Sequence, residues 1–213
     1  MGKIVLKDIN EALARVKDLV DASNKRIVIG IVGKPGAGKS TLTSHLIGNL
    51  PKDSAVLIPM DGYHLSNKQL SNLGISDRKG AFDTFDSDGF VKLLRRVNRE
   101  ADKDIYFPVF YREIEESYAA DGVVPANTKL VITEGNYLLL DKGGWEAVRQ
   151  ELDEVWYIEV DDNLRLDRLT KRHQSYGRNY DEAFAWANGS DERNAELVAK
   201  TRDKADVIIE IKQ

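Results

Sequence analysis

Residues 33–40 read Gly-Lys-Pro-Gly-Ala-Gly-Lys-Ser and match the pattern G-x-x-x-x-G-K-[ST] at every fixed position. In such a loop, backbone N–H groups close around a polyphosphate, glycines permit the bend, and the lysine reaches the outer phosphates. An apolar β-branched run precedes the loop at 26–32, and apolar residues at helical spacing follow it from Leu42 to Leu50. The chain is therefore predicted to hold a buried strand, a phosphate-binding loop and a helix in that order.

Two side chains of this loop are expected to act on a bound nucleotide. Lys39 is the candidate cation for the outer phosphates, and Ser40 is the candidate hydroxyl ligand of Mg2+. Backbone N–H groups of the loop and of the first helical turn are expected to hold the β-phosphate. The predicted nucleotide-binding residues are Gly33, Pro35, Gly36, Ala37, Gly38, Lys39, Ser40 and Thr41.

Apolar runs alternate with helical patterns along the rest of the chain. Buried strands are predicted at 26–32, 54–60, 129–137, 155–160 and 207–211. An opening helix near Asp8 has Ile9, Leu13, Val16 and Val20 on one apolar face. This alternation predicts a single α/β domain over residues 1–213, with a five-stranded parallel sheet covered by helices on both faces.

Composition narrows the class of protein further. The 213 residues include no cysteine, which removes disulfides and thiolate sites. A formal net charge of -4 gives no overall attraction to nucleic acid or anionic membranes. No stretch reaches the roughly 18 to 20 apolar residues of a membrane span. Residues 1–8 contain too short an apolar run for a signal peptide. We expect a cytoplasmic protein without a nucleic-acid or membrane partner.

Two segments, about 62–88 and 104–125, interrupt the alternation. Residues 65–88 are polar and are interpreted as a long loop, either functional or a solvated surface loop. The second segment is rich in aromatic residues. Within it, Pro108 argues against a central strand, and Asp121-Gly122 is typical of a turn. The sequence predicts a small hairpin laid over the site.

Acidic residues follow two of the predicted strands. Asp61 comes directly after the second strand and Glu134 closes the apolar part of the third. In open α/β sheets, ligands bind beyond the carboxyl ends of strands. Glu134 is therefore a candidate to orient Mg2+, directly or through water, although an acid at this place can also be a helix cap.

A basic stretch between the last two strands stands out in an acidic chain. Arg165, Arg168 and Arg172 lie at i, i+3 and i+7 and share one helical face, which suits a common anion. Tyr176-Gly177-Arg178 follows as a candidate hinge. We interpret residues 165–180 as a small lid over a nucleotide, and the alternative is a solvated helix face.

The ordered motifs resemble those of the uridine kinase, pantothenate kinase and phosphoribulokinase group of P-loop kinases. They are residues 33–40, Met60-Asp61-Gly62-Tyr63-His64, Arg78-Lys79-Gly80, Pro108-Val109-Phe110, Glu134-Gly135-Asn136-Tyr137 and the Arg168 and Arg172 lid. The similarity covers nearly the whole chain and is greatest to a short bacterial branch, described as pantothenate-kinase-like or fructose-transport-system kinase-like. It implies the strand order 2-3-1-4-5, ATP with Mg2+, and transfer of the γ-phosphate to a hydroxyl of a small molecule.

The resemblance also implies roles for individual residues. Asp61 matches the acid that faces the acceptor hydroxyl, and the two inserted segments match the acceptor side. The expected catalytic residues are Lys39, Asp61, Arg168 and Arg172, and the expected metal ligands are Ser40 and Glu134. The expected acceptor-side residues are Asp61, Tyr63, His64, Arg78, Tyr111, Glu134, Asn136 and Tyr137.

Two departures from the family pattern leave the acceptor open. The chain is short for the larger pantothenate kinases, and Tyr111-Arg112-Glu113 replaces the Tyr-Asp-Phe pattern of uridine kinases. Sugars, nucleosides, pantothenate-like compounds and other small alcohols all remain candidates. A regulatory P-loop NTPase that acts as a nucleotide switch is the alternative function. A homodimer is possible, but the sequence carries no signal of oligomeric state.

Overall fold

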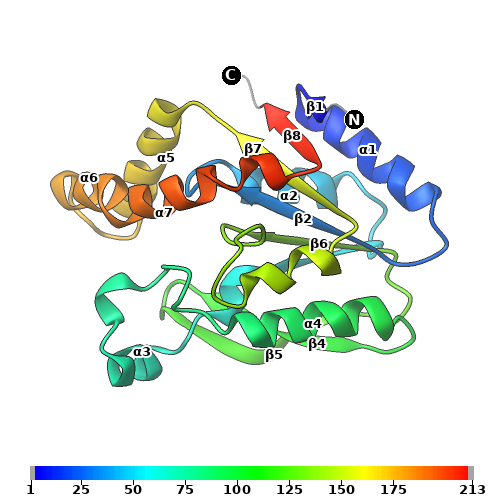
Figure 1. The fold of residues 1–213 in the computed structure, drawn as a ribbon, viewed down its shortest axis with the longest axis horizontal. Helices are drawn as coiled ribbons and strands as arrows, with labels where there is room; N and C mark the ends of the chain where they lie inside the picture. The colour runs from blue at the N-terminus through cyan, green and yellow to red at the C-terminus, as the bar shows by residue number, and fades with distance from the viewer. Residues whose placement is uncertain (1–2, 211–213) are drawn as a thin grey trace.

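The computed structural model describes residues 3–210, whose central element is a six-stranded, wholly parallel sheet (Figure 1). In spatial order the strands are β1 (Ile4–Leu6), β8 (Val207–Glu210), β7 (Glu154–Glu159), β2 (Ile27–Gly33), β6 (Leu130–Gly135) and β3 (Ala55–Pro59).

The predicted order of the five strands is confirmed, but the parallel sheet has six strands where the prediction had five. The additional strand, β1, pairs with β8 at the sheet edge. Ile4 and Val5 of β1 are 39% and 41% exposed, so this strand lacks the buried apolar run that marks the others. The last predicted strand extended to Ile211, which lies outside the described residues.

Residues 3–210 contain seven α-helices, and the first begins where the sequence predicts. The Asp8 side chain accepts hydrogen bonds from the backbone N–H groups of Asn10 and Glu11. None of these helices is long and apolar enough to cross a membrane. They are α1 (Ile9–Asp21), α2 (Lys39–Gly48), α3 (Asn67–Leu73), α4 (Ser87–Arg99), α5 (Asp162–Ser175), α6 (Tyr180–Asn188) and α7 (Ser190–Ala199).

The central strand β2 shows why both faces of the sheet are covered. All of its residues are buried, and successive side chains point to opposite faces. Val28 and Val32 pack in a core with α4. Ile29 and Ile31 pack in a second core with α1 and α2. Figure 1 shows α1 and α2 on one side of the sheet and α4 on the other, as the sequence predicts.

The sequence predicted that residues 65–88 form one long loop, and this prediction is wrong. It contains α3 and the short 3-10 turn Ser76–Arg78, and α4 begins at its end. The Ser66 side chain accepts a hydrogen bond from the N–H of Gln69, and Gly74 ends α3 with a φ of 69°. Because α3 has only seven residues and one buried apolar residue, Leu70, its periodicity is too weak to find in the sequence.

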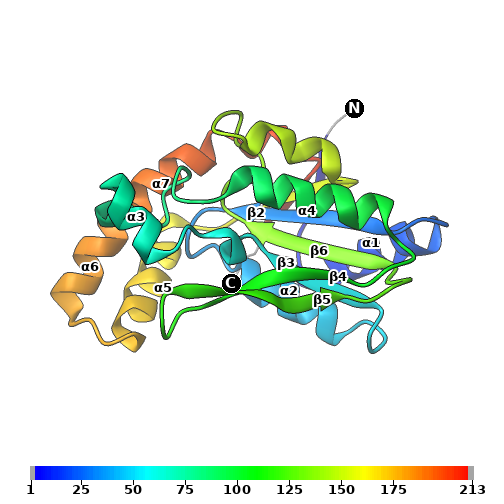
Figure 2. The same ribbon diagram turned by 90° about the horizontal axis from the view of Figure 1, so that it is seen from below.

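The predicted hairpin is present, but its turn lies elsewhere. Strands β4 (Ile105–Tyr111) and β5 (Glu116–Val124) pair antiparallel around a turn at 112–115 (Figure 2). Asp121-Gly122 lies within β5 and is not a turn. Gly122 is opposite Phe107, and a Cβ on Gly122 would lie 2.3 Å from that ring. The glycine is therefore required by side-chain packing, whereas the register shifts at Pro108.

The predicted lid falls on α5 and the turn that follows it. Helices α5, α6 and α7 pack in succession at the end of the molecule where the hairpin turn also lies (Figures 1 and 2). Gly177 has a φ of +92° in the turn between α5 and α6. The region predicted as a lid is mainly helical, and its closure over a ligand stays a prediction.

Candidate active site

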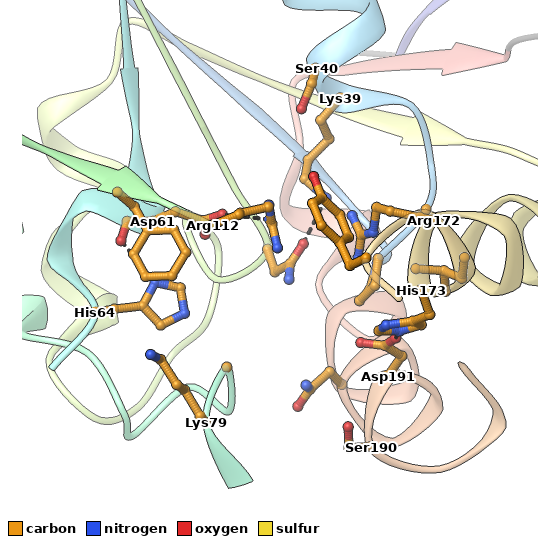
Figure 3. A pocket seen from close by; sticks show the side chains of 18 of the residues that line it. Lys39, Ser40, Asp61, His64, Lys79, Arg112, Arg172, His173, Ser190 and Asp191 are labelled. Carbon is orange, nitrogen blue, oxygen red and sulfur yellow. Dashed lines mark hydrogen bonds and ion pairs between the residues drawn. The ribbon is translucent and has the colours of Figure 1, made fainter. Parts of the chain in front are cut away.

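A cavity of about 930 Å3 lies beyond the carboxyl ends of β2, β3 and β6, where ligands bind in open α/β sheets. The phosphate-binding loop, the hairpin and the helices α5 and α7 line it. Figure 3 shows Lys39 and Ser40 at one end and Lys79, Asp191 and Ser190 toward the other. The cavity is large enough for a nucleotide and a second small molecule.

The phosphate-binding loop takes a shape that requires glycine at two positions. Gly36 and Gly38 have φ angles of +81° and +94°. A Cβ on Gly36 would lie 2.8 Å from the carbonyl oxygen of Arg165. Gly38 is also the N-cap of α2 and makes no side-chain cap, so the first N–H groups of α2 are left for an anion.

Most of the predicted nucleotide-binding residues line the cavity. Gly33 and Ala37 do not, because they are buried beneath the loop, where a Cβ on Gly33 would meet Ala37 at 3.1 Å. The lining members of the predicted set are Pro35, Gly36, Gly38, Lys39, Ser40 and Thr41.

Lys39 begins α2 and reaches back over the loop. Its Nζ donates to the carbonyl oxygens of Gly33 at 2.9 Å and Lys34 at 3.3 Å, and to Oδ1 of Asn136 at 2.6 Å. Burial lowers the pKa of Lys39 to about 8, although the charge of Glu134 acts to raise it. The ammonium group is held by neutral oxygens, which leaves its charge available to a phosphate group.

This lowered pKa predicts that nucleotide affinity falls at alkaline pH. Above about pH 8 the free protein holds mainly the neutral amine, whereas a polyphosphate favours the ammonium form. Binding must then take up a proton, and affinity for ATP should fall by about tenfold per pH unit. Calorimetry at pH 9 in buffers of different ionisation enthalpy measures this proton uptake.

The Lys39→Arg variant is the control for this pH dependence, because arginine remains charged over the whole range. This variant should bind ATP more weakly overall, but the side chain at position 39 should cause no change in its affinity between pH 7.5 and 9.5. An affinity of the unmodified protein that is flat over the same range would contradict the account of Lys39.

Glu134 and Ser40 meet at the place where a metal ion is expected. Ser40 Oγ donates to Oε1 of Glu134 at 3.0 Å, and Thr43 Oγ1 donates to Oε2 at 3.4 Å. Burial raises the pKa of Glu134, and the charge of Lys39 opposes this shift. One carboxylate and one hydroxyl fit Mg2+ when nucleotide phosphates supply further ligands. Residues 3–210 contain no cluster of three or more His, Cys, Asp or Glu side chains that could hold a metal alone.

Asp61 lies in a 3-10 turn, Met60–Tyr63, directly after β3. Gly62 of this turn approaches the hairpin so closely that a Cβ would lie 2.1 Å from the carbonyl oxygen of Pro108. Arg112, from the hairpin turn, donates to Oδ2 of Asp61 at 3.1 Å. Figure 3 shows this pair on the opposite side of the cavity from Arg172. The turn and the hairpin together place a carboxylate across from the phosphate-binding loop.

Arg168 and Arg172 line the cavity from α5. Arg168 lies over the loop, since a Cβ on Gly38 would lie 3.6 Å from its Nη1. Burial lowers the pKa of Arg172, and the nearby charge of Arg112 acts in the same direction. Within residues 3–210, neither guanidinium group has a carboxylate at ion-pair distance. Such unpaired guanidinium groups suit the oxygens of a phosphate group.

Arg165, the third arginine of the predicted set, does not enter the cavity. Its side chain is fully buried and donates to Asp162 at 2.8 Å and to Glu192. Its Nη1 also contacts the carbonyl oxygen of Pro35 at 3.4 Å. The expectation that all three arginines share one anion is therefore wrong for Arg165, which instead ties α5 to α7 and to the loop.

This difference predicts opposite behaviour for two arginines of one helix. Arg165→Ala should lower the free energy of unfolding by roughly 2 to 3 kcal/mol, because it removes a buried cation and leaves Glu192 unpaired. Arg168→Ala should change it by less than about 0.5 kcal/mol while lowering ATP turnover. Urea unfolding followed by circular dichroism measures the free energy of unfolding of each variant. Equal losses of stability in the two variants would contradict the assignment.

Two tyrosines predicted on the acceptor side belong to the apolar core. The Tyr63 ring packs edge-on against Phe90 with centroids 5.3 Å apart, and burial raises the pKa of Tyr63 to about 12. Tyr137 is 1% exposed, and its hydroxyl donates to the carbonyl oxygen of Gly80 at 2.6 Å. Neither lines the cavity, because each ring fills space between α4 or the 65–88 segment and the sheet.

Two further predicted acceptor-side residues are engaged outside the cavity. Arg78 forms an ion pair with Asp83 at 2.8 Å. The Tyr111 hydroxyl donates to Asp121 across the hairpin at 2.6 Å. The residues next to them in the sequence, Lys79 and Arg112, line the cavity in their place. The predicted residues that do line the acceptor side are Asp61, His64, Glu134 and Asn136.

The sequence predicted one wall of the cavity only in part, as the lid at 165–180. This wall comes from the end of α5, the turn after it, the end of α6 and the first turns of α7. A further sequence signal for it is His173, one of three histidines, directly after Arg172. The lining polar side chains that were not predicted are Asn67, Ser76, Lys79, Arg112, Glu115, His173, Tyr176, Arg178, Ser190, Asp191 and Asn194.

The parallel sheet with this strand order, the phosphate-binding loop beside Glu134, and the arginine-bearing helix define a P-loop kinase. A comparison with known families supports this class, since residues 28–213 match the Phosphoribulokinase / Uridine kinase family. The chain therefore belongs to this family.

Individual relatives agree with the family. A Schizosaccharomyces pombe protein that is named provisionally as a uridine kinase is 31% identical over 196 residues, covering 87% of this chain and 83% of its own. A Clostridium tetani protein named uridine kinase is 29% identical, covering 88% of each chain. A solved structure from Silicibacter sp. TM1040, described provisionally as a fructose transport system kinase, is 33% identical with a TM-score of 0.84, covering 94% of this chain and 98% of that one.

Proposed function

We propose that this protein transfers the γ-phosphate of ATP to a hydroxyl group of a small molecule. The observation that carries the proposal is the position of Asp61, whose carboxylate lies across the cavity from Arg172 and the phosphate-binding loop. Two anions in contact repel each other, so Asp61 and a γ-phosphate require a group between them. An acceptor hydroxyl fits this place, because it donates to the carboxylate and presents its oxygen to phosphorus.

The phosphate half of the cavity supplies alignment and charge, which are the main requirements of phosphoryl transfer. Lys39 and the N–H groups of the loop hold the outer phosphates. Arg168 and Arg172 contact the oxygens of the transferring group from α5. Ser40 and Glu134 would hold Mg2+, which would counter the negative charge of the phosphate oxygens.

Asp61 acts on the acceptor. Its carboxylate accepts a hydrogen bond from the acceptor hydroxyl and takes the proton as the new oxygen–phosphorus bond forms. The bond between the γ-phosphorus and the β-phosphate oxygen breaks, and ADP is released. Arg112 holds the Asp61 carboxylate in place through its hydrogen bond to Oδ2.

A regulatory NTPase that works as a nucleotide switch shares the loop and Glu134 but needs no acceptor site. The cavity extends past Asp61 to Lys79 and to Asp191, beyond the reach of Lys39 and Ser40 (Figure 3). A polar, lined space next to the position of the γ-phosphate favours a second substrate over a switch.

Measuring ATP consumption with added small molecules tests the proposal. The panel holds sugars, polyols, nucleosides, pantothenate and hydroxy acids, each with saturating ATP and Mg2+. At least one compound should raise the rate by tenfold or more over the rate without acceptor. A rate that no member of the panel changes would favour the switch.

A further inference from the structure

The half of the cavity beyond Asp61 points to the chemical class of the acceptor, an inference that rests on the proposed function. We propose that the acceptor is an uncharged, non-aromatic polyhydroxy compound, a sugar or polyol, and that Asp191 binds one of its hydroxyl groups. The charges, the aromatic rings and the hydrogen-bonding groups of this half carry the inference independently.

One wall of this half is formed by the hairpin turn and the 65–88 segment, and we call it the hairpin wall. Each cation on this wall already pairs with a carboxylate. Arg112 pairs with Asp61 at 3.1 Å. Lys79 pairs with Glu115 at 3.5 Å, and its Nζ also donates to Oδ1 of Asn67 at 2.7 Å. All of these side chains line the cavity. A carboxylate or phosphate group on the acceptor would therefore have to displace an existing ion pair.

On the opposite wall, formed by the ends of α5 and α6 and the start of α7, one histidine links a positive and a negative side chain. Nε2 of His173 lies 2.7 Å from Oδ2 of Asp191, and Nη1 of Arg178 lies 2.9 Å from Nδ1 of His173. Arginine is always a donor, so Nδ1 accepts, and the neutral ring donates from Nε2 to Asp191. The charges of Arg178 and Asp191 are joined in one network, and Arg178 also lies over the Trp186 ring at 4.5 Å.

The two walls together hold three cations and three carboxylates, so their charges cancel. The phosphate half has more cations than carboxylates. There, the three cations Lys39, Arg168 and Arg172 share one lining carboxylate of that half, Glu134, and the carboxylates of Asp61 and Asp191 act on Arg172 from the other half. The excess positive charge matches the net negative charge of a nucleotide with Mg2+. The electrical balance of the other half matches an uncharged acceptor, because the cations of its two walls, Lys79, Arg112 and Arg178, are already engaged with other side chains.

Aromatic rings on the hairpin wall already pack against other side chains, which disfavours the stacking of a nucleobase there. The His64 ring lies between Phe85 at 4.0 Å and Phe110 at 4.6 Å, measured between centroids. Lys79 covers Phe110 at 5.4 Å. On the opposite wall Arg178 covers Trp186. Tyr176 is 55% exposed and lines the cavity from the end of α5, four residues after Arg172.

The remaining polar atoms of this half suit hydroxyl groups. Within residues 3–210, Oδ1 of Asp191 has no hydrogen-bond donor, although the side chain is only 16% exposed and lines the cavity. Ser190 and Asn194 line the cavity beside it, and Figure 3 shows Asp191 and Ser190 facing the space across from His64. His64 donates from Nδ1 to the carbonyl oxygen of Asp61 at 2.8 Å, which leaves Nε2 as an acceptor. Acceptor atoms on both walls bind the O–H donors of a polyol.

The first experiment compares acceptor classes under saturating ATP and Mg2+. D-fructose, D-ribose, xylitol and glycerol represent neutral polyhydroxy compounds, uridine represents nucleosides, and D-glycerate and pantothenate represent anionic alcohols. The proposal expects kcat/KM of the best neutral compound to exceed that of uridine and of both acids by at least tenfold. A higher kcat/KM for uridine or for an acid would overturn it and leave the kinase assignment standing. Stimulation by none of them would contradict the proposed function itself.

The second experiment examines Asp191 with the best neutral acceptor. Asp191→Asn should raise the KM for that acceptor by about ten- to a hundredfold, with kcat and the KM for ATP changed by less than about threefold. Glu196→Gln, an exposed position on the same helix, is the control and should change none of these constants. A purely structural role of Asp191 would instead lower thermal stability or change kcat and both KM values together. Either that pattern or an unchanged acceptor KM would contradict the role of Asp191.

Discussion

Replacing Lys39 by alanine is expected to lower ATP turnover by at least about a thousandfold and to leave the fold intact. The loss follows from the position of Nζ, which is held over the loop by the oxygens of Gly33, Lys34 and Asn136. Among the described residues that line the cavity there is one other lysine, Lys79, and it lies at the far end.

The fold should survive because the substitution removes a desolvated cation. Burial lowers the pKa of Lys39, which means that the folded protein destabilises its charged form. We expect the free energy of unfolding to change by less than about 1 kcal/mol. Lys34→Ala is the matched control: this lysine lies in the same loop, but its Nζ pairs with Asp162 at 2.5 Å. Its turnover should fall by less than about tenfold. Retained turnover in Lys39→Ala would refute the assignment of the loop.

Asp61→Asn is expected to separate nucleotide binding from phosphoryl transfer. The amide keeps the size of the side chain and a hydrogen-bond acceptor but cannot take a proton. Transfer to the acceptor should fall by about two orders of magnitude or more, the usual contribution of a positioned general base. Affinity for ATP should stay equal or increase, since one negative charge near Arg172 and Lys39 is lost.

The comparison with Arg112 shows whether Asp61 acts by chemistry or by holding the hairpin. Arg112→Gln breaks the same ion pair and keeps the carboxylate. If Asp61 is the base, this variant should lose far less activity than Asp61→Asn. Equal losses would indicate that the ion pair, and not proton transfer, is what the reaction requires. Transfer within a few fold of the unmodified protein in Asp61→Asn would send the search for a base to Glu134.

The sequence predicted those parts of the fold that local patterns determine. Buried strands such as β2 appear as continuous apolar runs, and the loop at 33–40 fixes the strand before it and the helix after it. The strand order came from the resemblance and is confirmed. β1 was missed because its three half-exposed residues carry no pattern. Within β5, Gly122 was taken as part of a turn, whereas it is required by packing against Phe107.

The site was harder to predict because burial and long-range pairing decide it. Arg165, Arg168 and Arg172 share a helical face in the sequence, yet only the structure shows that Asp162 and Glu192 hold Arg165. The wall formed by His173 and Asp191 joins residues from two helices that share no sequence motif. Such a wall is visible only after α5 and α7 have packed.

The central claim, that a small-molecule hydroxyl receives the phosphate, is tested most directly by measuring all products of one reaction. ADP, inorganic phosphate and phosphorylated acceptor are quantified together by chromatography and mass spectrometry, with the acceptor that stimulates ATP consumption most. The account predicts one phosphorylated acceptor for each ADP and little inorganic phosphate. Equal amounts of ADP and inorganic phosphate, with the acceptor recovered unmodified, would contradict it.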